Sequence, residues 1–370
     1  MPNPFFCCSC IQNPKYFFGR EKELVRIFNA LETTHTGQMQ SVSVVGPRRI
    51  GRSSLLVHVT QTFDQRLRHP ENYIFYYADL LSGRYSTRLG LLQNILGGLA
   101  DKLPNTAESL KVALKTVSQL PEITLGQFEE AIALFRQDSA NPLCPVICLD
   151  EIEQLTKYSD EFPRWLFDSW RSLINNGSLA FVISSSKPLF EMAEEESLTS
   201  PFFNIFSDYL SLGELTEAEA FRLAEQGKRC ERPFTTEDIE RVREWGEQHP
   251  LKLQQAGATI YHAKAETNPK WRDVKADFEN KVGQAFGQRP AKQRWFNGLL
   301  SIVETVGKAV PLGKAADQKV HRLVGSFILL VLFVVLTLWL LSPAMRSWIV
   351  QEINFPTSTP VPVPTDTPIP

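Results

Sequence analysis

The sequence predicts an α/β fold with a parallel sheet, followed by a small all-α region and one long apolar segment. Three observations lead to this prediction. A glycine-bracketed loop at residues 46–54 joins an apolar run to an amphipathic one. A second apolar run ends in the acid pair Asp150 and Glu151, as a buried parallel strand does when its tip faces a ligand. Residues 323–341 carry no charged side chain.

The loop reads Gly-Pro-Arg-Arg-Ile-Gly-Arg-Ser-Ser. A strand that ends in a tight loop before a helix directs backbone N–H groups and the helix dipole at one spot, which suits phosphate. The pattern is the P-loop G-x-x-x-x-G-K-[ST], with Arg52 in place of lysine. Taken alone, it is also compatible with an ordinary loop that holds two glycines. The candidate nucleotide-binding residues here are Gly46, Pro47, Arg48, Arg49, Ile50, Gly51, Arg52, Ser53 and Ser54.

The helix after the loop is predicted from one apolar stripe, in which Leu55, Val59, Phe63 and Leu67 recur every four residues. In the loop before this helix, Arg48 and Arg49 are expected either to contact phosphate or a neighbouring subunit, or to form a solvated basic loop.

The acid pair supplies what a nucleotide site needs beside the loop. Asp150 is expected to hold the Mg²⁺ shell, with Ser53 as the second protein ligand. Glu151 is expected to polarise the attacking water as general base. An acid pair at this place also suits the start of a helix, but the upstream P-loop favours the first reading.

Three more strands are expected at residues 73–79, 179–186 and 209–212, and helical stretches alternate with them as βαβ units require. The strand at 179–186 ends in hydroxyl side chains. Ser184 or Ser185 would sense the γ-phosphate there, or would simply end the strand.

Four motifs occur in one order along the chain. They are Phe18-Gly19-Arg20-Glu21-Lys-Glu-Leu24, the loop with Arg48-Arg49-Ile50, the strand Ile-Cys-Leu-Asp-Glu, and His249-Pro250-Leu-Lys-Leu-Gln254. In this order they resemble the STAND branch of the AAA-like P-loop ATPases, the signal-transduction ATPases with numerous domains. The resemblance covers residues 15–265.

The resemblance implies a P-loop NTPase with a five-stranded parallel sheet and a helical lid that closes over ATP and Mg²⁺. It places Gly19 and Arg20 near the base and Pro250 on the adenine side. Arg52 takes the place of the lysine that bridges the β- and γ-phosphates, and Gln248 replaces a glycine in the lid turn. Because arginine is a wider planar fork than lysine, weak or slow hydrolysis is expected. The predicted function is a nucleotide-dependent switch; the alternative is a scaffold protein that holds nucleotide without hydrolysis.

The composition of the chain limits which further partners are expected. The chain has 370 residues and a net charge of −2, so no global field attracts nucleic acid, and none is expected as a partner. Six cysteines in a chain of this length do not indicate a disulfide framework. Cys7, Cys8 and Cys10 are interpreted as reduced thiols of an N-terminal arm, with a zinc site or lipidation as alternatives.

The apolar segment predicts a single membrane span. Its residues, at about 1.5 Å each in a helix, cross roughly the 30 Å hydrocarbon layer. Four basic residues precede it closely and one follows, so the positive-inside rule places the ATPase domain in the cytoplasm of a membrane-anchored protein and a short tail outside.

The predicted domains follow from these elements, and the expected partners are nucleotide, membrane, and a second copy or another protein. The domains are an N-terminal arm 1–17, a P-loop NTPase domain 18–212, a helical lid 213–265, a helical connector 266–322, a transmembrane helix 323–341 and a Pro/Thr-rich tail 342–370.

Overall fold

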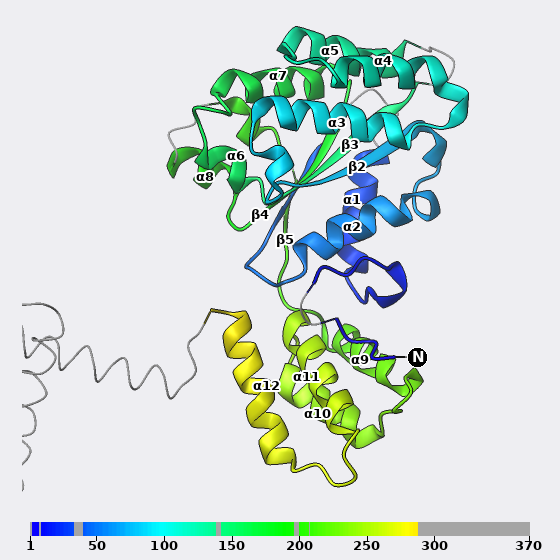
Figure 1. Cartoon of the computed structure of the whole chain (residues 1–370), viewed down its shortest axis with the longest axis vertical. Coiled ribbons are helices and arrows are strands. Elements are labelled where there is room, and N and C mark those ends of the chain that lie inside the picture. The colour runs from blue at the N-terminus through cyan, green and yellow to red at the C-terminus, as the bar shows by residue number, and fades with distance from the viewer. Residues whose placement is uncertain are drawn as a thin grey trace, which may run out of the picture. The chain divides into compact units, whose positions relative to one another are not determined.

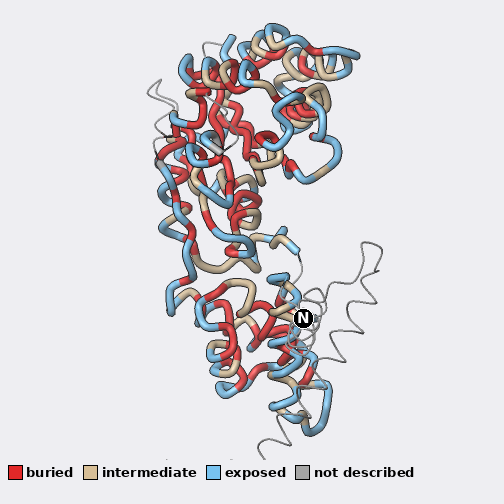
Figure 2. Tube along the Cα trace, turned by 90° about the vertical axis from the view of Figure 1, so that its left-hand side faces the viewer, coloured by how far each residue is buried: buried red, intermediate tan, exposed pale blue. Residues whose placement is uncertain are grey.

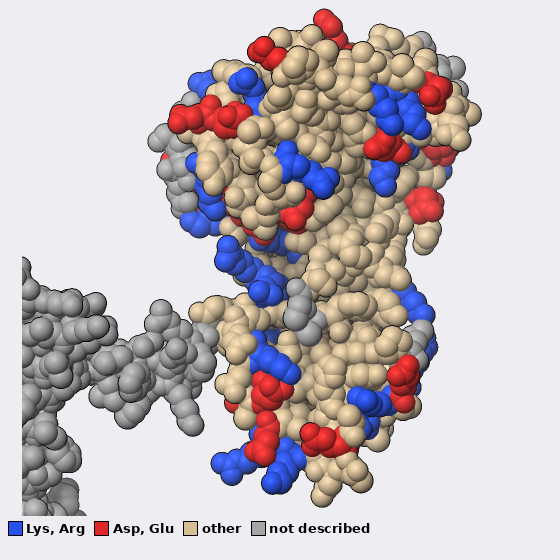
Figure 3. Space-filling view, in the orientation of Figure 1, with Lys and Arg blue, Asp and Glu red and all other residues tan. Residues whose placement is uncertain are grey.

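The structure is a computed structural model that describes residues 2–6, 9–32, 40–137, 142–195, 200–206 and 208–287. Residues up to 282 form one compact unit, which holds the sheet and the helices that follow it. Acidic and basic side chains are mixed over the face that Figure 3 shows, in keeping with the small net charge.

The centre of the unit is the predicted five-stranded parallel sheet, in the order β2-β3-β4-β1-β5 (Figure 1). The strands are β1 (Val42–Val45), β2 (Tyr73–Asp79), β3 (Cys144–Asp150), β4 (Ala180–Ser185) and β5 (Asp208–Ser211). Strand β4 lies between β1 and β3, so the carboxyl ends of the loop-bearing strand and the acid-bearing strand face each other across one strand. This order brings residues that are far apart in the sequence to one edge of the sheet.

Helices cover both faces of the sheet, and the three central strands β1, β3 and β4 are buried along nearly their whole length. One face packs against α1 (Glu21–Glu32) and α2 (Arg52–Thr62), which share a core with alternate residues of β1 to β4. The other face packs mainly against α3 (Arg88–Lys102), α5 (Leu125–Ala133) and α7 (Arg164–Asn175). The remaining helices of this part are α4 (Glu108–Ser118), α6 (Glu153–Lys157) and α8 (Leu189–Glu195).

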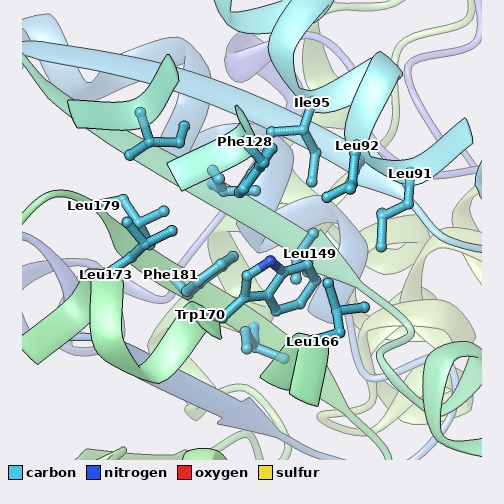
Figure 4. Close-up of a cluster of buried hydrophobic side chains, with 14 of the residues drawn as sticks. Leu91, Leu92, Ile95, Phe128, Leu149, Leu166, Trp170, Leu173, Leu179 and Phe181 are labelled. Carbon is cyan, nitrogen blue, oxygen red and sulfur yellow. The ribbon is translucent and has the colours of Figure 1, made fainter. Parts of the chain in front are cut away.

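The larger core is built around Trp170, a fully buried side chain of α7 (Figure 4). Its ring centroid lies 5.1 Å from that of Phe181 on β4 and 5.8 Å from that of Phe202. Figure 2 shows that buried residues follow the strands and the inner faces of the helices. The sheet is therefore a rigid base for the loops at its carboxyl edge.

Four further helices follow the sheet: α9 (Glu217–Glu225), α10 (Thr236–Gly246), α11 (Pro250–Ala263) and α12 (Trp271–Ala285). They form a small all-α region with its own apolar core. Helices α9 and α10 begin with capping boxes, Thr216 with Glu219 and Thr235 with Asp238, which define where the helices start.

The N-terminal arm packs on this α9–α12 region. Phe5 is 4% exposed, and its ring stacks on Phe234 at 5.4 Å. The backbone N–H of Phe6 donates to Gln254 of α11 at 2.9 Å. A Cβ atom on Gly257, in the middle of α11, would lie only 2.3 Å from the Phe5 ring. Glycine in a helix interior costs about 1 kcal/mol relative to alanine, and here it makes room for the ring.

We expect Gly257→Ala to destabilise the fold although alanine favours a helix. The new methyl group displaces Phe5, whose burial contributes about 1.5–3 kcal/mol, so the net loss in unfolding free energy is about 1 kcal/mol. In a Phe5→Ala background the same substitution has no ring to displace and should stabilise by up to about 1 kcal/mol. Urea denaturation of the four proteins measures this change of sign. An equal effect of Gly257→Ala in both backgrounds would contradict the contact.

The predicted fold class needs one correction. No helix among the described residues is long and apolar enough to cross a membrane. The longest, α3 and α12, have 15 residues and extend about 22 Å, short of the roughly 30 Å hydrocarbon layer. The sheet and the all-α region of the prediction remain, whereas the transmembrane helix and the membrane localisation that depends on it find no support in the described residues. Residues 323–341, to which the prediction assigned the span, lie outside the described residues, as do the tail 342–370 and most of the connector 266–322.

Candidate nucleotide-binding site

The loop between β1 and α2 depends on its two glycines for different reasons. Gly51 has a φ of 101°, in the left-handed region that favours glycine, although a Cβ there would meet nothing within 4 Å. At Gly46 a Cβ would approach the carbonyl oxygen of Leu212 to 3.0 Å. Arg49 also has a positive φ, 68°. The loop is therefore a tight turn held close to the residue that follows β5.

The start of α2 can receive an anion. Gly51 is its N-cap residue, and no side chain caps the helix. The first N–H groups of an α-helix have no partner within the helix, so they are donors for a bound anion. The loop thus fits a phosphate group by backbone geometry alone.

Arg52 is the first residue of α2, and its side chain is only 4% exposed. Its Nη2 donates to Glu151 Oε1 at 2.7 Å. Its Nη1 lies 3.7 Å from Glu153 Oε1 and has no hydrogen-bond partner in the described part of the chain. A buried guanidinium nitrogen with an unused N–H fits a phosphate oxygen as its missing partner.

Asp150 ends β3 and is 2% exposed. Its Oδ2 accepts a hydrogen bond of 2.9 Å from Tyr77 on β2, and its Oδ1 accepts one from Ser184 on β4. A carboxylate has about four lone-pair sites, so both oxygens can still accept from metal-bound water. The described residues contain no cluster of three or more metal ligands. Mg²⁺ needs only one or two protein ligands beside phosphate and water, and Ser53 and Asp150 would supply them.

Glu151 adopts a φ of 58°, which is uncommon for a residue with a side chain and often marks a functional site. Its backbone N–H donates to Ser184 Oγ at 3.2 Å. Burial raises the pKa of the Glu151 carboxyl above its ordinary value, while the Arg52 guanidinium acts in the opposite direction. Its Oε1 accepts from Arg52 Nη2, so any role of this carboxylate as a base would compete with the ion pair.

The structure distinguishes the two serines at the end of β4. Ser184 joins the acid pair, since its hydroxyl donates to Asp150 and accepts from the Glu151 N–H. The Ser185 hydroxyl instead donates to the Lys187 carbonyl at 2.6 Å, inside the turn that follows. The predicted role of Ser184 or Ser185 as a γ-phosphate sensor stays a prediction.

Gly19 and Arg20 connect the loop to the α9–α12 region. Arg20 is buried, and its Nη2 donates to the carbonyl oxygens of Ile50 at 3.2 Å and Gly213 at 2.6 Å. Its backbone N–H donates to Glu219 of α9 at 2.7 Å. A Cβ on Gly19 would lie 2.8 Å from the Glu219 side chain. Their predicted place beside the base is untested, and the contacts show a structural link.

Pro250 is the first residue of α11. The turn before it contacts the segment between β5 and α9, to which Arg20 also binds. The Leu215 N–H donates to the Gln248 carbonyl at 2.9 Å, two residues after Gly213. No side chain caps α11 at His249. The proposed contact of Pro250 with adenine stays a prediction.

The N-terminal arm also reaches the site. The Ile11 N–H donates to Ser54 Oγ at 3.1 Å, on the first turn of α2. Burial raises the pKa of the neighbouring Cys10 thiol above its ordinary value, so this thiol stays protonated. Cys7 and Cys8 lie outside the described residues.

Two residues of the site have no signal in the sequence. Tyr77 lies in the middle of an aromatic strand pattern, and Glu153 is one of many acids in a helical stretch. Each becomes part of the site only when the strand order places β2 beside β3 and the start of α6 beside the loop.

With the site's geometry described, the chain can be set beside known proteins. Residues 16–182 match the AAA ATPase domain. The match covers the loop, the acid pair and the first half of β4, so the P-loop and AAA parts of the predicted resemblance are confirmed. The STAND subtype is not.

Solved structures are similar to this chain, and the first of them shares its fold. A Walker-type ATPase of Pyrococcus abyssi is 16% identical with a TM-score of 0.55, over 81% of this chain and 82% of that one. The ORC1 protein of Aeropyrum pernix in complex with DNA is 16% identical with a TM-score of 0.45, over 80% and 69%. The RuvB Holliday junction branch migration motor of Thermotoga maritima is 13% identical with a TM-score of 0.43, over 82% of each chain. No curated protein matches the sequence.

Proposed function

We propose that this protein binds ATP and Mg²⁺ at the loop of residues 46–54, hydrolyses ATP slowly and acts as a nucleotide-dependent switch of the STAND type. The observation that carries the proposal is the buried Arg52 at an uncapped helix start, with an N–H of Nη1 that has no hydrogen-bond partner among the described residues. A buried N–H group without a hydrogen-bond partner lowers the stability of the fold, unless a bound anion accepts from it.

Each residue of the site has a chemical role in the proposed reaction. The loop amides and Arg52 bind the phosphates, and Ser53 and Asp150 hold Mg²⁺, which neutralises charge on the phosphate oxygens. Glu151 accepts a proton from water as the water oxygen bonds to the γ-phosphorus and the bond from that phosphorus to the ADP oxygen breaks. Tyr77 and Ser184 keep the Asp150 carboxylate in place.

Slow turnover follows from the ion pair of Arg52 with Glu151. While the pair is closed, the carboxylate that should take the proton is bound to a cation. This same contact favours the second candidate function, a scaffold protein that holds nucleotide and does not hydrolyse it.

The switch would use the link through Arg20. This side chain holds the carbonyl of Ile50 in the loop and that of Gly213 before α9, and its backbone holds Glu219 on α9. A phosphate that moves the loop would therefore move the start of the α9–α12 region. We propose that the moved region exposes a face for a second copy or another protein.

The test is nucleotide binding and turnover by the full chain. We expect saturable ATP binding that depends on Mg²⁺, with turnover above that of a Glu151→Gln protein. Binding with equal background turnover in both proteins would favour the scaffold. Absence of binding would overturn both candidates.

A further inference from the structure

Glu153 is a second acid on the P-loop arginine. It is the first residue of α6, and its side chain is 13% exposed. Its Oε1 accepts the backbone N–H of Ser186 and lies 3.7 Å from Arg52 Nη1. Its Oε2 is buried and has no hydrogen-bond partner within the described ranges. The nearby Nη1 also lacks one, so each group is charged, buried and incompletely paired.

The guanidinium is thus shared between two carboxylates, with Glu151 on Nη2 and Glu153 near Nη1. A planar fork with five N–H donors can face two acids at once, whereas a lysine ammonium is a single point charge. The arginine at this P-loop position and the acid at residue 153 therefore form one electrostatic unit.

We propose that Glu153 is an affinity-setting residue of the nucleotide site, because it competes with phosphate for Arg52. This inference rests on the proposed function. Without nucleotide, Arg52 is drawn toward the acids. With nucleotide, the same Nη1 N–H group must donate to a phosphate oxygen. Binding therefore replaces the contact of Arg52 with Glu153 by a contact with phosphate, and only the difference between the two free energies contributes to the affinity.

A neutral side chain at this position should then tighten nucleotide binding. Glu153→Gln keeps the size of the side chain and the oxygen that accepts the Ser186 N–H, and it removes only the charge. We expect the dissociation constant for ATP to fall about fivefold, the value of an ion pair worth about 1 kcal/mol. Glu151 is unsuitable for this test because its substitution also removes the general base.

Removal of any negative charge near the phosphates can by itself raise ATP affinity, so the test requires a control variant. Asp79 ends β2 beside Asp150 in the register of the sheet, and its Oδ1 accepts the Leu81 N–H at 3.0 Å. Asp79→Asn therefore removes one charge at the same sheet edge and keeps this hydrogen bond. We expect it to change ATP affinity by less than about twofold.

The experiment is calorimetric titration of the full chain with ATP and Mg²⁺ for the wild type, Glu153→Gln, Asp79→Asn, Arg52→Lys and the double variant Arg52→Lys/Glu153→Gln. In the lysine background, the gain from Glu153→Gln should shrink to less than about twofold, since the shared fork is gone. Thermal melting without nucleotide checks that each variant is folded. If Glu153→Gln does not fold, Glu153→Asp, which draws the charge away from Arg52, should also tighten binding.

The outcomes separate this inference from the proposed function. Binding by the wild type with no gain from Glu153→Gln would overturn the role of Glu153 and leave the ATP site intact. An equal gain from Asp79→Asn, or an undiminished gain in the lysine background, would also overturn it. Failure of both the wild type and Glu153→Gln to bind would overturn the ATP site as well.

Discussion

Glutamine at position 151 is expected to reduce ATP turnover by about 100-fold or more, because a general base contributes at least that factor. The amide keeps the size of the side chain but cannot take a proton from water. Its oxygen can still accept from Arg52 Nη2, which Glu151 does at 2.7 Å. ATP binding should therefore persist and even tighten, since one charge that competes for Arg52 is removed.

Steady-state phosphate release by the wild type, Glu151→Gln and a control measures this effect. Glu122→Gln is the control, because this exposed acid lies between α4 and α5, away from the site. Burial raises the pKa of Glu151, so wild-type turnover should fall on the acid side as this carboxyl is protonated, and the glutamine variant should lack that limb. Equal turnover in all three proteins would remove Glu151 from the reaction.

Loss of the Arg52 side chain is expected to weaken ATP binding by about 100-fold. Hydrogen bonds from a charged group contribute about 1.5–3 kcal/mol each, and Nη1 of this buried side chain has no hydrogen-bond partner among the described residues. Arg52→Lys keeps the charge but cannot face Glu151 and Glu153 together. In that variant binding should remain within about fivefold of wild type, and turnover should rise because Glu151 is released.

Fluorescent nucleotide titration and phosphate release, applied to wild type, Arg52→Ala and Arg52→Lys, separate the two effects. Melting without nucleotide shows whether each variant is folded. ATP affinity that is the same in all three proteins would place Arg52 outside the binding site.

The parts of the site that could be predicted are those with a local cause. The loop from Gly46 to Gly51 and the acid pair at Asp150 and Glu151 follow from apolar runs that end in special residues, and these patterns require only neighbours in the chain. The parallel sheet follows in the same way, because strands and helices alternate.

The contacts that change the chemistry are not local. Arg52 reaches Glu151 across 99 positions of sequence, and Tyr77 reaches Asp150 across 73. Both depend on the strand order, which no pattern in the sequence specifies. The room that Gly257 leaves for Phe5 is likewise a match between distant segments.

The membrane span is the expectation that the described residues contradict, since none of their helices is long and apolar enough to cross a membrane. It rested on length and lack of charge at residues 323–341, which lie outside the described residues.

The central claim is that the loop of residues 46–54 binds a nucleoside triphosphate. Equilibrium titration of the full chain with ATP and Mg²⁺ tests it most directly. We predict saturation at one nucleotide per chain with a dissociation constant below about 1 mM, which corresponds to about 4 kcal/mol, and loss of that saturation in Arg52→Ala. A folded wild-type protein that shows no saturable binding of any purine triphosphate at millimolar concentration would contradict it.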